Sequence, residues 1–155
     1  MISNELKTTI QGAYSRFLEA KSLKPRYGQR LMIAEVAKVL GDIDTDDEGR
    51  RSGDPAVVAV EAGTGTGKTV AYSLAAIPTA KAAGKRLVIA TATVALQEQI
   101  VYKDLPDLMR NSGLNFSFSL AKGRGRYMCL SKLDMLLQEG HAQTATAQLL
   151  SLIHI

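Results

Sequence analysis

A glycine-rich segment, residues 61–69, places a lysine and a threonine at the spacing of a nucleotide phosphate loop. It lies between an apolar, β-branched run and a helical pattern, which is the context that such a loop requires. Its glycines let backbone N–H groups turn toward phosphates, and the start of the next helix adds partial positive charge. The residues expected to contact a nucleotide are Ala62, Gly63, Thr64, Gly65, Thr66, Gly67, Lys68, Thr69 and Val70.

Two side chains of this loop carry the chemistry of phosphoryl transfer. Lys68 is expected to reach the β- and γ-phosphates, and the Thr69 hydroxyl is expected to bind Mg²⁺. These two are therefore the predicted catalytic residues. A tight structural turn is the alternative, which the Gly-Lys-Thr order between a strand and a helix disfavours.

Phosphoryl transfer also needs an acidic pair that binds Mg²⁺ and positions water. The one Asp-Glu pair of the sequence, Asp47-Glu48, lies upstream of the phosphate loop in a solvated acidic stretch. We therefore expect nucleotide binding without efficient turnover. If turnover were found, the missing acid would have to be one of Glu61, Asp104 and Asp107.

The elements around the loop follow an alternating order. Hydrophobic periodicity predicts helices over 6–22, 29–40, 68–83, 94–104 and 129–139, and strands over 56–62, 86–91 and 115–120. A left-handed Gly41 is expected to close the second helix, and Pro78 to interrupt the third. Thr93 is expected to cap the fourth helix, which should end ahead of Pro106. Strand, helix, strand, helix, strand predicts an α/β fold with a parallel sheet, preceded by two N-terminal helices.

Composition limits the class of protein. The chain has 155 residues, 46% of them hydrophobic, which fits one globular domain. Residues 41–54 hold six acidic and two basic residues, so against an overall charge of +4 the rest carries +8, compatible with a polyanionic ligand. One cysteine excludes an internal disulfide. Without a leader-like start or an apolar run of about 20 residues, we expect a cytoplasmic protein with no membrane partner.

Four blocks, in this order, resemble the amino-terminal part of the DinG-type DNA helicases, relatives of the XPD-like iron-sulfur helicases of superfamily 2. They are residues 26–32, 61–69, 88–100 and 123–129, and the resemblance spans residues 1–149. It implies a partial P-loop NTPase domain of the RecA-like helicase type, in which Ala62 in place of a glycine is tolerated. It also implies ATP and Mg²⁺ as cofactors, 5′ to 3′ movement on single-stranded DNA, a role in DNA repair, and a bacterial cytoplasmic protein, monomeric at full length.

The resemblance assigns roles to further residues. Gln29 matches the glutamine that reads the adenine edge, although a polar residue near a helix start is the alternative. Thr91 and Thr93 match a loop that touches the backbone of single-stranded DNA, and a plain strand-to-helix turn is compatible with that role. Arg124 and Arg126 are expected to contact DNA phosphates, unless they form only a solvated face.

Cys129 matches the first of four cysteine ligands of a [4Fe-4S] cluster. Residues 123–149 would then begin an iron-sulfur region whose other three cysteines are absent from this sequence. A lone cysteine without that context is more often a buried bystander.

Several alternatives remain at this point. The blocks predict a truncated N-terminal part of a helicase ATP-binding domain over residues 1–149. We interpret residues 150–155 as a sequencing-adapter segment, with an ordinary apolar C-terminus as the alternative. A helicase serving a CRISPR system is a variant of the same prediction. There are two competing functions. One is a phosphate-loop ATPase that powers something other than strand separation, and the other is a nucleotide- or DNA-binding module without catalysis.

Overall fold

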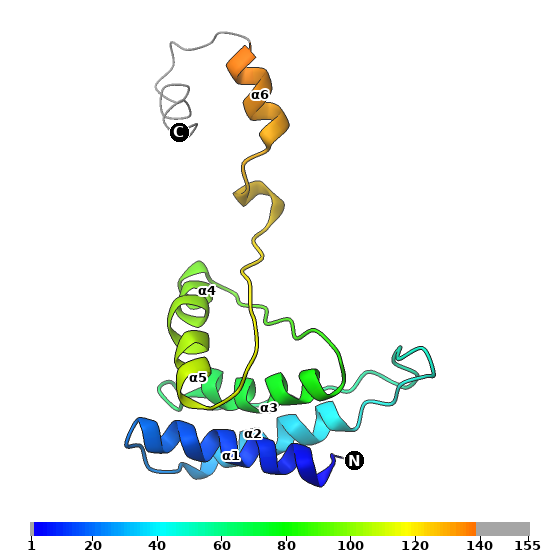
Figure 1. Cartoon of the computed structure of the whole chain (residues 1–155), viewed down its shortest axis with the longest axis vertical. Helices are drawn as coiled ribbons and strands as arrows, with labels where there is room; N and C mark the ends of the chain where they lie inside the picture. Colours follow the sequence, from blue (N-terminus) through cyan, green and yellow to red (C-terminus); the bar gives the residue numbers. More distant parts are fainter. Residues whose placement is uncertain (1, 139–155) are drawn as a thin grey trace. The chain divides into compact units, whose positions relative to one another are not determined.

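The computed structural model describes residues 2–138 and divides the chain into two units, residues 1–119 and 120–155 (Figure 1). The first unit contains α1 (Asn4–Ala20), α2 (Tyr27–Gly41), α3 (Lys68–Ala82), α4 (Val94–Gln99), a π-helical turn η1 (Ile100–Asp104) and α5 (Leu105–Asn111). The second contains a 3₁₀ turn η2 (Arg124–Arg126) and α6 (Leu130–Gln138). The predictions for residues 139–155, including the suspected adapter segment, lie outside the described residues.

Helix ends in the first unit follow local capping rules. Ser3 accepts a hydrogen bond from the Leu6 N–H at 3.1 Å, and this starts α1. Thr93 accepts one from the Leu96 N–H at 3.2 Å, which confirms the predicted cap of α4. Gly84, at φ 63°, ends α3 with bonds from its own N–H and from the next one to carbonyls of the last turn.

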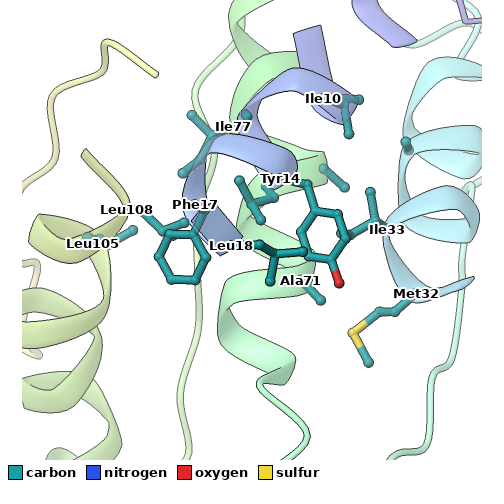
Figure 2. Packing of buried hydrophobic residues seen from close by; sticks show 14 of the residues in the cluster. Ile10, Tyr14, Phe17, Leu18, Met32, Ile33, Ala71, Ile77, Leu105 and Leu108 are labelled. Carbon is teal, nitrogen blue, oxygen red and sulfur yellow. The ribbon is translucent and has the colours of Figure 1, made fainter. Parts of the chain in front are cut away.

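Helix α3 is the centre of the hydrophobic core. Ala71, Leu74 and Ala75 are fully buried on it. Helices α1 and α2 both pack against α3, and α5 packs against α1. Figure 2 shows Phe17 of α1 beside Leu108 of α5, within the same cluster. The core thus encloses the helix that directly follows the phosphate loop.

The predicted parallel sheet is wrong for the structure described here. No strand forms in the three apolar segments, which are residues 56–62, 86–91 and 115–120. Within the described range, residues 2–138, the β-pairing consists of a single antiparallel bridge, Thr45 with Arg51. A strand is stable only when a neighbouring strand completes its hydrogen bonds. These segments run without such a neighbour, so most of their side chains are exposed, while Ala62, Ile89 and Phe116 are partly buried against the core.

Three details of the helix predictions are also wrong. Gly41 is not a left-handed cap: it is the last residue of α2, and a Cβ there would lie 2.6 Å from an Ile2 side-chain atom. Pro78 does not interrupt α3, which continues to Ala82. The helix after Thr93 does not stop ahead of Pro106, because η1 adds a wider turn and α5 continues beyond it.

The acidic stretch forms an ordered turn of its own. The Asp46 carboxylate accepts hydrogen bonds from the N–H groups of Arg50 and Glu48, at 2.8 and 3.0 Å, and from the Arg50 side chain. The bond from the Arg50 N–H is the main cause that lowers the pKa of Asp46. The stretch, which the sequence predicts to be solvated, also contacts a distant part of the chain, because Lys85 donates to the Gly49 carbonyl.

Candidate nucleotide-binding site

The phosphate loop is built from left-handed glycines and a helix start. Gly65 and Gly67 have φ values of 74° and 75°, a conformation that L side chains rarely adopt. Helix α3 begins at the next residue, Lys68. The loop therefore ends at a helix N-terminus, whose free N–H groups and partial positive charge suit an anion.

The Lys68 ammonium lies over its own loop. It donates to the carbonyl oxygens of Ala62 and Gly63 at 2.7 and 2.8 Å. Thr66 donates to the same Gly63 carbonyl at 2.9 Å, which closes the turn. The structure therefore holds a cation at the loop beside the helix start, a donor set that fits the phosphates of a nucleotide.

The other predicted loop residues differ in exposure. Thr64 is exposed, Thr69 is half-buried in the first turn of α3, and Val70 packs against the core. A hydroxyl oxygen is a hard ligand of the kind that Mg²⁺ takes. Thr69 therefore fits its predicted role, although no cluster of three metal-binding side chains occurs among the described residues.

Gln29 lies directly against the phosphate loop. A Cβ built on Gly67 would lie 2.3 Å from the Gln29 Nε2 atom, so the amide occupies the space that only a glycine leaves free. The Gln29 Oε1 atom accepts a hydrogen bond from the Tyr14 hydroxyl at 3.2 Å. Arg26 approaches the loop too, because its guanidinium donates to the Gly65 carbonyl at 3.0 Å.

A small pocket of about 210 Å³ joins these residues. Gln29, Gly67 and Val70 line it on one side, and Asp107 contributes to its wall. Pockets that enclose a whole drug-sized ligand have about 300–1,000 Å³. The pocket therefore suits part of a ligand, such as one flat base.

Among the acidic candidates, Asp107 lines the pocket beside the loop and Glu61 adjoins the loop in sequence. Asp107 pairs with Lys21 at 2.6 Å and accepts from Asn111, and Asp104 accepts from Gln99 at 3.1 Å. Their carboxylates are thus engaged with neighbouring side chains. Asp47 and Glu48 belong to the acidic turn, where Glu48 pairs with Arg50 at 2.7 Å. Glu61 is exposed next to the loop.

The predicted DNA-binding residues fall into two groups. Thr91 donates to the Thr93 carbonyl at 3.2 Å and lies at the start of α4 in the first unit. Arg124 and Arg126 form the exposed turn η2 of the second unit, where the Tyr127 hydroxyl accepts from the Lys122 N–H at 2.7 Å. The structure therefore orders each group locally, within its own unit.

Cys129 is exposed and free. It is not the buried bystander of the alternative hypothesis. A [4Fe-4S] cluster needs four thiolates, and the sequence contains one cysteine. The residues present therefore do not hold such a cluster by themselves.

Sequence reasoning gives no role to two residues of this site. Tyr14 falls within the predicted helix 6–22 without a task of its own, and Arg26 is only part of the block 26–32. For Arg26 the missed signal is its spacing from Gln29. Arg26 stands three residues before Gln29 at the start of a helix. For Tyr14 the sequence contains no signal beyond a phenol on a buried face.

Comparison with known proteins agrees with this geometry. The DEAD/DEAH box helicase family model matches residues 50–151. The ATP-dependent DNA helicase DinG of Photobacterium profundum is 40% identical over 147 residues, which are 94% of this chain and 20% of that protein. DinG of Escherichia coli (strain K12) is 46% identical over 132 residues, 84% of this chain and 17% of that protein.

The chain spans at most a fifth of the length of these relatives. The family match nevertheless covers most of the chain and includes the phosphate loop. The resemblance to DinG-type helicases drawn from the four blocks is confirmed. The chain belongs to the DEAD/DEAH box helicase family.

Proposed function

We propose that this chain is the ATP-binding part of an ATP-dependent DNA helicase that moves 5′ to 3′ on single-stranded DNA. This proposal rests on two left-handed glycines that precede the helix beginning at Lys68. It also rests on the Lys68 ammonium, which is held over the loop. The names of the relatives, ATP-dependent DNA helicases, supply the substrate class.

Each residue of the site has a distinct task in the proposal. The backbone of residues 63–68 surrounds the phosphates, and Lys68 leaves the loop carbonyls to pair with them. Gln29 recognises the base at the pocket beside Gly67. A bound Mg²⁺, held by Thr69, would neutralise charge on the phosphates.

Contact with DNA is proposed for two surfaces. Thr91 and Thr93 offer hydroxyls and N–H groups at the start of α4, which suit a sugar-phosphate backbone. Arg124 and Arg126 are exposed cations with no acidic residue from 115 to 132, so they suit phosphates. Cys129 remains proposed as one cluster ligand, with the other three supplied outside this sequence.

Replacement of the loop lysine tests the proposal. In Lys68→Ala, we expect Mg-ATP affinity to fall about 10- to 100-fold, the worth of a charge-assisted contact. Isothermal titration calorimetry on the 155-residue chain measures it. Lys103→Ala, which removes an exposed lysine of η1, is the matched control and should bind Mg-ATP as the unchanged chain does.

Equal affinity of Lys68→Ala and the unchanged chain would reject the phosphate loop as the site. Phosphate release on single-stranded DNA is the second measurement, and we expect it to be negligible for this chain. A helicase-like rate would instead require a catalytic acid among Glu61, Asp104 and Asp107.

A further inference from the structure

The Tyr14 hydroxyl lies between two polar atoms of the segment that leads to the phosphate loop. Tyr14 is 8% exposed, on the face of α1 that packs in the core. Its oxygen is 3.3 Å from the Arg26 backbone nitrogen and 3.2 Å from Gln29 Oε1. Figure 2 shows its ring among Leu18 and Ile33, so packing fixes where the hydroxyl points.

Donor and acceptor counting sets the direction of these bonds. A backbone N–H only donates, so the Tyr14 oxygen accepts from Arg26. The single phenolic proton is then free for Gln29, whose carbonyl oxygen accepts it. The Gln29 amide therefore has one orientation: its oxygen faces Tyr14, and its NH₂ group faces Gly67.

We propose that Tyr14 is a positioning residue that makes this pocket selective for adenine, an inference that rests on the proposed ATP site. Adenine offers an acceptor, N7, beside the N6 amino donor. An amide with its NH₂ group and its oxygen held side by side complements that pair. Guanine offers two acceptors on the same edge, so the fixed Gln29 oxygen faces one of them.

Arg26 extends this connection to the loop. Its backbone N–H binds Tyr14, while its guanidinium binds the Gly65 carbonyl at 3.0 Å. Arg26 thus links the Tyr14 phenol, which orients the Gln29 amide, to the backbone of the phosphate loop. Tyr14 does not line the pocket, so it acts on the base through Gln29, and the Arg26 N–H holds the phenolic oxygen in place.

Removal of the hydroxyl alone tests the inference. Tyr14→Phe keeps the buried ring and should lower Mg-ATP affinity about 3- to 10-fold, the worth of one hydrogen bond between neutral groups. Affinity for tripolyphosphate, which has no base, should not change, and the preference for ATP over GTP should shrink accordingly. Calorimetry on the 155-residue chain measures all three ligands, with Tyr102→Phe, 72% exposed, as the matched control.

A double-mutant cycle separates positioning from packing. In a Gln29→Ala background, Tyr14→Phe should have no further effect on ATP, because the residue it orients is gone. Unchanged ATP affinity in Tyr14→Phe would overturn the inference while leaving the ATP site intact. Equal losses for ATP and tripolyphosphate would overturn it in favour of a purely structural role. No ATP binding to the unchanged chain would overturn the proposed function and this inference together.

Discussion

The phosphate loop joins two apolar regions that behave in opposite ways. After the loop, α3 buries Ala71 and Leu74 completely. Before it, the segment 56–62 leaves Val57 80% exposed, and the segment 86–91, which follows α3, leaves Val88 84% exposed. Both regions are rich in apolar side chains, so hydrophobicity alone does not decide which one is buried.

The difference lies in the hydrogen bonds of the backbone. A helix pairs its N–H and C=O groups within itself, and only its side chains need partners. A strand must find a second strand before burial becomes favourable, because an unpaired buried peptide group is costly. The helical part of this molecule therefore organises the site, and the apolar segments add only partly buried side chains to the core, Ala62, Ile89 and Phe116.

Truncation of a core side chain gives the largest expected contrast. Leu74→Ala should lower the free energy of unfolding by about 2–5 kcal/mol, because it leaves a cavity in a fully buried site. Val57→Ala should change it by less than about 0.5 kcal/mol, since the side chain is already exposed. Urea unfolding measures both. Similar losses would show that residue 57 packs as in a sheet.

Two glycines on either side of the loop sharpen the same contrast. Gly67→Ala should cost about 1–2 kcal/mol of backbone strain at its φ of 75°, and its methyl would displace the Gln29 amide. Gly63, after the apolar segment, has nothing within 4 Å of its Cβ position. Gly63→Ala should therefore leave stability unchanged. Thermal melting compares the two, and equal shifts would contradict the fit of Gln29 against Gly67.

The helices and the loop could be predicted from sequence because their signals are local. Thr93, the predicted cap, acts within one turn of the chain, and the spacing of the loop determines where α3 begins. Long-range partners leave no such signal. The close approach of Ile2 to Gly41 and the contacts from Gln29 to Gly67 and Tyr14 are visible only in the structure.

The strand predictions failed for a related reason. Their β-branched composition reports a preference for extended backbone, not the presence of a neighbour. Pro78 shows the reverse case, because it is a local signal for a helix end that packing overrides, whereas Pro106 lies in the first turn of α5, where a proline is tolerated. Tertiary contacts bury α3 on several sides and keep it helical through Pro78.

Two buried serines test how far hydrogen bonding governs the helical part. Ser112 and Ser73 are both fully buried. The Ser112 hydroxyl donates to the Leu108 carbonyl at 2.6 Å and accepts from the Leu114 N–H, whereas within residues 2–138 the Ser73 hydroxyl has no partner. Ser112→Ala should cost about 1 kcal/mol, and Ser73→Ala should be neutral or stabilising. Chemical unfolding that gives the opposite order would contradict this ranking.

Hydrogen exchange of the backbone amides tests the central contrast most directly. In the 155-residue chain, amides of residues 71–77 and 79 should exchange slowly, and those of 56–60 and 86–88 should exchange at nearly unprotected rates. Mg-ATP should then slow exchange in residues 63–70 and leave the apolar segments unchanged. Protection of 56–60 and 86–88 equal to that of α3 would mean that these segments are paired strands, and would contradict the account.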